Sequence, residues 1–151
     1  MTPKELKAQY RNERLAARDA IAPDERIEKG LAMLAHAGDV IEVEPGTIVS
    51  GFLPIRSEVD IRPLMARLRE RGARLCVPVI LDKLTIVFRE LVPGAPLIAS
   101  GFGTAGPGPD AAVLDPELML VPLSAFDSTG HRIGYGAGIT TAPSIVCIKK
   151  A

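Results

Sequence analysis

A strand, a helix and a second strand that follow one another through short connections constrain the fold of this chain most. Residues 47–53 are apolar and rich in β-branched side chains, and proline and glycine bound them, which predicts a buried strand. The apolar residues between 61 and 68 predict a helix, and residues 74–79 predict the next strand. Such a unit is right-handed with parallel strands. The turn after Leu53 is therefore expected at the carboxyl end of the sheet, where open α/β sheets bind ligands.

The other segments fit the same α/β class. Two helices are expected before this unit, one beginning with a capping box at Thr2 and one at 23–38. Further strands are expected at 84–89 and 118–122. Glycine and proline crowd the segment 92–109, which predicts a long functional loop, either a mobile flap or an ordered lid.

Composition fits one domain of this class. The chain has 151 residues, 47% of them apolar, and a formal net charge of zero, so no global field attracts nucleic acid or a membrane surface. No apolar run reaches membrane-spanning length, and the N-terminus is charged from Lys4 onward, unlike a signal peptide. Cys76 and Cys147 lie in apolar runs without a neighbouring histidine, which favours buried reduced thiols over a disulfide or a zinc site. These features predict a cytoplasmic protein.

The segment 124–138 is the strongest candidate for a functional loop. Arg132 stands just before glycines at alternate positions, Gly134, Gly136 and Gly138. Glycines leave backbone amides uncovered, so successive N–H groups can converge on an anion, and an arginine adds a charged fork for phosphate oxygens. Glycines in a loop also simply form turns, and the spacing alone does not separate the two hypotheses.

A basic stripe follows one face of the expected first helix. Its members recur at steps of three and four residues and are Lys4, Lys7, Arg11, Arg14 and Arg18. Nearby acidic side chains allow ordinary surface pairing, so the stripe fits a solvated face. It also fits an arm that brings cations to an anionic ligand.

Glu58 lies in the turn after the first strand of the central unit. It precedes the established helix and is away from that helix's apolar face. A carboxylate there can complement the charge at the helix N-terminus, or it can contact a ligand at the sheet edge. Both roles remain open.

Three motifs in order resemble the 5-formyltetrahydrofolate cyclo-ligase family, also called methenyltetrahydrofolate synthetase. They are a Lys-x-x-x-Arg pair at 7–11, the segment 52–60, and the segment 121–138 with its Arg-Ile-Gly-Tyr-Gly-Ala-Gly ending. The resemblance implies a three-layer α/β/α fold with a mostly parallel sheet. It also implies ATP- and magnesium-dependent closure of 5-formyltetrahydrofolate to 5,10-methenyltetrahydrofolate, with release of ADP and phosphate. The implied partner is a reduced folate, and a monomer is expected.

The resemblance also implies roles for individual residues. It places the ATP contacts on seven residues: Lys7, Arg11, Arg132, Gly134, Tyr135, Gly136 and Gly138. Arg132 is the expected catalytic residue, and Leu53 and Glu58 are the expected folate contacts; the metal ligands are not assigned. Phe126 is expected in the core, and Asp127 is expected to fix the loop instead of binding metal.

After Gly138 the chain departs from the family pattern, which continues with an aromatic or His-Tyr pair and then Asp-Arg. We therefore divide the chain into a domain at 1–138 and an atypical tail at 139–151, with C-terminal family elements expected to be missing. Loss of one cytosine from codons for Gly-His-Tyr-Asp-Arg-Ala-Ile gives Gly-Ile-Thr-Thr-Ala-Pro-Ser, the sequence of 138–144. The tail is thus expected to be out of frame; the alternative is a final strand at 144–148. The alternatives for function are a catalytically impaired nucleotide- or folate-binding remnant and a phosphate-sugar binding domain.

Overall fold

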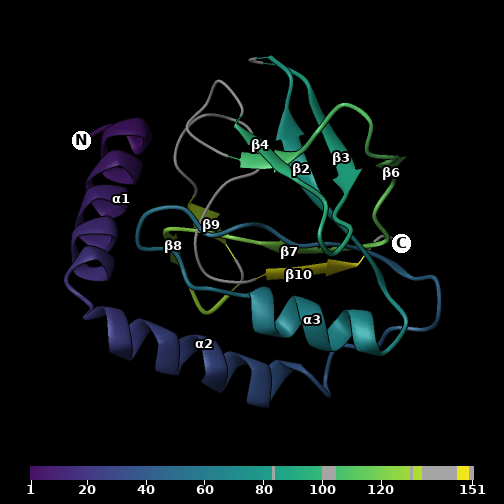
Figure 1. Ribbon diagram of the computed structural model, residues 1–151. Coiled ribbons are helices and arrows are strands. Elements are labelled where there is room, and N and C mark those ends of the chain that lie inside the picture. Colours follow the sequence, from purple (N-terminus) through teal and green to yellow (C-terminus); the bar gives the residue numbers. More distant parts are fainter. Residues whose placement is uncertain (83, 100–104, 130, 134–145, 150–151) are drawn as a thin grey trace.

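The computed structural model describes residues 1–82, 84–99, 105–129, 131–133 and 146–149. Its elements follow one another along the chain as shown in Figure 1. The helices are α1 (Pro3–Asp19), α2 (Pro23–Ala37) and α3 (Arg62–Glu70). The strands are β1 (Ile48–Ser50), β2 (Arg74–Ile80), β3 (Ile86–Glu90), β4 (Leu97–Ala99), β5 (Ala105–Pro107), β6 (Val113–Leu114), β7 (Leu118–Val121), β8 (Ala125–Phe126), β9 (Arg132–Ile133) and β10 (Val146–Lys149).

The main sheet has six strands in the order β10-β7-β1-β2-β3-β6. Its three central strands β7, β1 and β2 are parallel, and the β2·β3, β3·β6 and β10·β7 pairs are antiparallel. The expected α/β class is therefore confirmed, and the parallel strands expected of it form the centre of the sheet. The parallel pair β1·β2 is joined through α3, as the strand, helix and strand pattern predicts.

Helix α3 packs on one face of the sheet, and α2 lies outside α3, while α1 lies to the side next to β8 (Figure 1). The capping box expected at Thr2 is present, because Thr2 Oγ1 accepts from Glu5 N at 3.2 Å and Glu5 Oε2 accepts from Thr2 N at 2.7 Å. A second helical layer on the opposite face is not formed by the residues described. None of the helices among these residues is long and apolar enough to span a bilayer.

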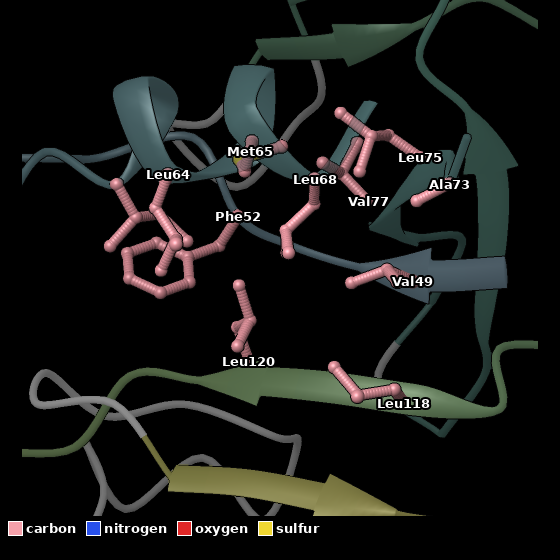
Figure 2. Packing of buried hydrophobic residues seen from close by; sticks show 11 residues of the cluster. Val49, Phe52, Leu64, Met65, Leu68, Ala73, Leu75, Val77, Leu118 and Leu120 are labelled. Atoms are coloured by element: carbon pink, nitrogen blue, oxygen red, sulfur yellow. The ribbon is translucent and has the colours of Figure 1, made fainter. Parts of the chain in front are cut away.

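The apolar core lies between α3 and the parallel strands (Figure 2). Alternate residues of the strands face it, such as Leu75 and Val77 of β2 and Leu118 and Leu120 of β7. Helix α3 supplies Leu64, Met65 and Leu68, as the spacing of its apolar residues predicts. Cys76 and Val121 point to the other face and are also buried, so both faces are covered at the centre, as is typical of parallel strands.

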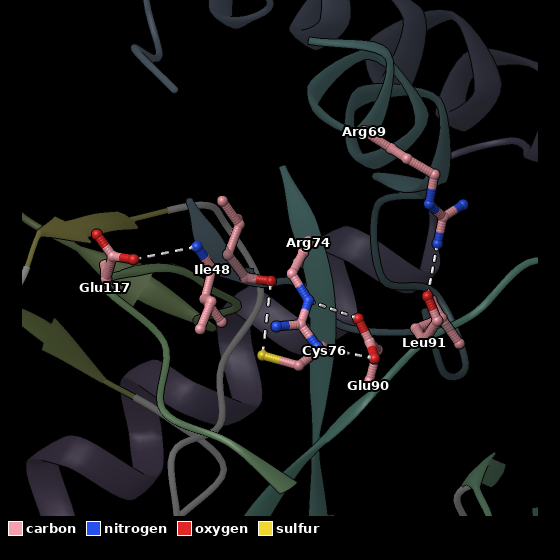
Figure 3. A network of polar contacts seen from close by, with 8 residues as sticks. Ile48, Arg69, Arg74, Cys76, Glu90, Leu91 and Glu117 are labelled. Carbon is pink, nitrogen blue, oxygen red and sulfur yellow. Dashed lines mark hydrogen bonds and ion pairs between the residues drawn. The ribbon is translucent and has the colours of Figure 1, made fainter. Parts of the chain in front are cut away.

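Polar contacts lie at the end of the sheet where β2 starts and the antiparallel β3 ends (Figure 3). Arg74 Nε donates to Glu90 Oε2 at 3.0 Å, and this pairing lowers the pKa of Glu90 below its ordinary value. Nearby, the Cys76 thiol donates to the Val49 carbonyl at 3.6 Å, and burial raises the pKa of Cys76 to about 12. Cys76 is therefore the buried reduced thiol that the sequence predicts.

Two small antiparallel sheets lie outside the main one. The pair β4·β5 lies within the segment expected to form a long loop, and β8·β9 lies within the glycine-rich segment. Strand β10 pairs antiparallel with β7, opposite Leu118 to Val121. The alternative of a final strand after residue 144 is thus realised in the fold, whereas the reading frame of the tail stays a hypothesis.

Candidate functional site

The carboxyl ends of the neighbouring parallel strands β1 and β7 bring two segments to one edge of the sheet. The turn 51–58 follows β1, and the β8·β9 hairpin follows β7. In parallel α/β sheets this edge is the ligand-binding edge. The structure therefore places the turn with Leu53 and Glu58 and the hairpin with Arg132 at the edge that the sequence predicts.

Glu58 is 5% exposed and stabilises its own turn. Its Oε1 accepts from Ile55 N at 2.8 Å, and its backbone N donates to Ile55 O at 3.1 Å. Arg56 between them has a φ of 52°, in the left-handed region that non-glycine residues seldom adopt. Because α3 begins only at Arg62, Glu58 lies outside the first turn of that helix. The hypothesis that Glu58 complements the charge at the helix N-terminus is therefore wrong. The expected folate contact of Glu58 stays a prediction.

Gly51 allows the turn to leave β1 close to α3. A Cβ built on Gly51 would lie 2.6 Å from Met65 Sδ, which is shorter than the contacts that Cβ atoms make in proteins. The absence of a side chain therefore lets Met65 pack under the start of the turn. Leu53, two residues later, is half-buried.

Ser57 connects this turn to α1, and the sequence analysis missed it. Its side chain is buried; Oγ accepts from Arg18 Nε at 2.7 Å and donates to Asp19 Oδ1. The partners are 39 and 38 residues away along the chain. A serine in a turn has no sequence signal for such a distant junction, so the contact could be found only in the structure.

The β8·β9 hairpin presents Arg132 beside α1. Phe126 of β8 pairs with Arg132 of β9, and α1 lies against β8. Ser124 closes the hairpin, because its backbone N and its Oγ both donate to Ile133 O at 2.8 Å. The Arg132 side chain is exposed and makes no hydrogen bond or ion pair with the described residues. Its charge is therefore available to a ligand.

Asp127 fixes the loop of this hairpin, as the sequence predicts. Its Oδ1 accepts from Thr129 N at 2.9 Å, Thr129 Oγ1 at 2.8 Å and His131 N at 3.0 Å, and Oδ2 lies 3.0 Å from His131 Nδ1. The hydrogen bond from the Thr129 side chain is the main reason why the pKa of Asp127 is well below its ordinary 3.8. The carboxylate orders the loop just before Arg132.

The position of Phe126 contradicts the prediction made from the sequence. It was expected in the core, yet it is 69% exposed. The reason is that it belongs to a two-residue strand in a separate hairpin, so it has no sheet face to bury it.

Helix α1, which carries the predicted ATP contacts Lys7 and Arg11, lies on the same side of the molecule as the hairpin (Figure 1). Lys7 is exposed and Arg11 is half-buried, and α1 lies against β8. No buried residue belongs to α1, so its polar face is largely open to solvent. The structure brings together three elements, α1, the turn 51–58 and the hairpin. Gly134, Tyr135, Gly136 and Gly138 lie outside the described residues.

A cavity of about 280 Å³ adjoins the turn. Leu53 forms part of its wall, with apolar residues of α3 and the segment 91–97. Two arginines also line it, and each guanidinium makes a polar contact within the protein. Arg62 Nη2 contacts Asp60 Oδ2 at 2.8 Å, which lowers the pKa of Asp60, and Arg69 Nη2 donates to Leu91 O at 2.6 Å. The lining of the cavity therefore combines apolar side chains with two arginines, of which Arg62 is paired with a carboxylate.

The described residues do not identify the ligands of a magnesium ion. Within these ranges no group of three or more His, Cys, Asp or Glu side chains is placed to hold a metal ion. Magnesium usually takes one or two carboxylates together with phosphate oxygens. Asp127 is the carboxylate nearest in sequence to Arg132, and its oxygens are used within the loop.

Comparison with known proteins agrees with this architecture. The protein is similar to the 5-formyltetrahydrofolate cyclo-ligase of Escherichia coli K12, with 27% identity over 127 residues that cover 80% of this chain and 70% of the relative. The enzyme of the same name from Mycolicibacterium smegmatis is 32% identical over 102 residues, covering 62% of this chain and 52% of the relative.

Two solved structures have a similar fold. The 5,10-methenyltetrahydrofolate synthetase of Aquifex aeolicus superposes with a TM-score of 0.73 at 26% identity, covering 87% of this chain and 68% of the other. The synthetase of Mycoplasma pneumoniae has a TM-score of 0.68 over 87% and 73% of the two chains, and its 18% identity supports the fold alone. The sequence profile of one family matches residues 3–142. Because this match spans nearly the whole length, the chain belongs to the 5-formyltetrahydrofolate cyclo-ligase family, a family of ligases.

Proposed function

We propose that this chain converts 5-formyltetrahydrofolate to 5,10-methenyltetrahydrofolate with ATP, releasing ADP and phosphate. The observation that carries the proposal is the meeting of α1, the turn 51–58 and the Arg132 hairpin at the carboxyl edge of β1 and β7. These are the three segments whose motifs resemble the family. The proposal places the enzyme in the cytoplasm as a monomer that acts on a small molecule.

In the proposed reaction the formyl oxygen attacks the γ-phosphate of ATP and displaces ADP, the N10 nitrogen then adds to the activated carbon, and phosphate leaves. Catalysis of phosphoryl transfer depends mainly on alignment and on positive charge near the equatorial oxygens. Arg132 supplies that charge, while Lys7, Arg11 and the amides of 134–138 bind the ATP phosphates. Leu53 and Glu58 contact the folate. Magnesium would neutralise phosphate charge in this reaction, but no ligand set in the described residues supports assigning it.

The test is the absorbance of methenyltetrahydrofolate formed from 5-formyltetrahydrofolate with and without ATP. Turnover that requires ATP supports the proposal. A second protein, in which the tail from residue 139 is restored to the frame encoding His-Tyr-Asp-Arg, is assayed beside it. If both proteins are inert, the enzyme assignment fails. If only the restored protein turns over and the present chain is stabilised by ATP or folate without turnover, this chain is the binding remnant.

Asp127 provides a prediction on the hairpin. Asp127→Ala removes the acceptor that orders the loop, and we expect kcat/KM to fall about tenfold because Arg132 is no longer held in place. Asp110→Ala, an exposed aspartate outside the hairpin, is the matched control and is expected to leave kcat/KM unchanged.

The lowered pKa of Asp127 also predicts how activity depends on pH. Since the folded pKa is lowered, the loop contacts are present above the ordinary value of 3.8 and are lost only as pH falls through the folded value. The pH profiles of wild type and Asp127→Ala are therefore expected to be parallel between about pH 5 and 8. Profiles that diverge in this range would contradict this expectation.

A further inference from the structure

Helix α1 contributes no buried side chain to the part of the fold that the structure describes. It has no buried residue over Pro3–Asp19, and its apolar side chains Leu6 and Tyr10 are exposed. Burial of apolar surface therefore contributes little to its orientation. Its last turn, however, meets a buried polar group of the site turn.

That polar group is Ser57, which joins α1 to the turn. The hydroxyl makes two hydrogen bonds to α1, because it accepts from Arg18 Nε at 2.7 Å and donates to Asp19 Oδ1. Both partners carry charge, and hydrogen bonds to charged groups are stronger than those between neutral groups. The junction therefore holds the C-terminal turn of α1 against Ser57 of the turn 51–58.

The turn itself has a second, independent support. Glu58 accepts from Ile55 N and donates its own N–H to Ile55 O, and neither contact involves Ser57 or α1. Loss of the Ser57 hydroxyl is therefore expected to release α1 while the turn keeps its shape.

We propose that Ser57 is a positioning residue that sets α1, and with it the ATP contacts Lys7 and Arg11, against the turn that binds the folate. The inference rests on the proposed function and goes beyond it, because Ser57 is not among the residues proposed to contact ATP or the folate. An unanchored α1 must be ordered when ATP binds, which weakens ATP binding. The folate side, supported by Glu58, is left unchanged.

The test compares the Michaelis constants for the two substrates. Ser57→Ala is expected to raise the KM for ATP about tenfold and to leave the KM for 5-formyltetrahydrofolate within about twofold. Ser50→Ala, which removes another buried serine hydroxyl, controls for the loss of a buried polar group and is expected to change neither KM. Equal changes in both KM values for Ser57→Ala, or no change in either, overturn the proposal.

Asp19→Ala removes the acceptor of the Ser57 hydroxyl by changing an exposed residue. This variant therefore tests the same junction if Ser57→Ala fails to fold. It is expected to reproduce the rise in the KM for ATP, and the double variant is expected to be no worse than either single one, because both remove one contact. Glu13→Ala is the matched control, since it also removes one negative charge from α1. Fully additive effects of Ser57→Ala and Asp19→Ala would contradict a shared junction.

A structural readout separates this inference from the proposed reaction. Hydrogen–deuterium exchange is measured on peptides covering 3–19 in wild type and Ser57→Ala. Faster exchange in these peptides, with β1 and α3 unchanged, supports the junction even if wild type shows no turnover and the proposed function fails. Unchanged exchange in 3–19 overturns the positioning role whatever the activity.

Discussion

Arg132→Ala is expected to lower kcat/KM for ring closure about a thousandfold, with a melting temperature unchanged from wild type. The guanidinium is exposed in β9 and makes no hydrogen bond or ion pair with the described residues, so its loss removes no polar interaction there. Its charge is instead expected to act on the phosphoryl group in the transition state, where arginines contribute most to catalysis. The measurement is steady-state formation of methenyltetrahydrofolate, together with a thermal melt.

Two further variants sharpen this test. Arg132→Lys keeps the charge but loses the planar fork, so it is expected to recover only part of the activity. Arg67→Ala removes an exposed arginine of α3, whose ion pair with Asp39 at 3.4 Å is on the surface, and is expected to retain full activity. If Arg132→Ala loses less than about threefold, or if Arg67→Ala loses as much, the catalytic assignment of Arg132 is wrong.

Local patterns predicted the centre of the fold correctly. Buried parallel strands are near-continuous apolar runs, so Val49 in β1 and Val77 in β2 were identifiable from the sequence. The apolar residues of α3 repeat at helical spacing, and Leu64 and Leu68 are buried as expected. Helix α2 shows the limit of the same argument. Leu31 lies on its apolar face but is 51% exposed, because α2 packs on α3 and not on the sheet.

The candidate site was predictable in part. The carboxyl edge followed from the connection of β1 to β2, and the loop-fixing role of Asp127 was expected together with the family resemblance. The hairpin that carries Arg132 did not, since strands of two residues have no periodicity. Ser57 did not either, because its partners are nearly forty residues away. Short elements and tertiary hydrogen bonds therefore account for what the sequence analysis missed.

Leu68→Ala is expected to lower the free energy of unfolding by about 3 kcal/mol. Leu68 belongs to α3 and has no exposed surface, and its side chain lies between the helix and the parallel strands (Figure 2). Its truncation removes apolar burial and leaves a cavity that the rigid sheet cannot close. For a chain of this size the melting temperature is expected to fall by roughly 6–12 °C. Urea denaturation gives the free energy directly, and an unchanged slope shows that the folded state remains intact.

Leu31→Ala is the matched control, with the same chemical change at an exposed position of α2, and a change within about 0.5 kcal/mol is expected. The Michaelis constants of Leu68→Ala, measured below its melting transition, are expected to equal those of wild type. The reason is that the site is built on the turn and the hairpin, which hold their shape through the contacts of Glu58 and Asp127. Raised Michaelis constants in the folded variant would show instead that the site depends on core packing beneath the sheet.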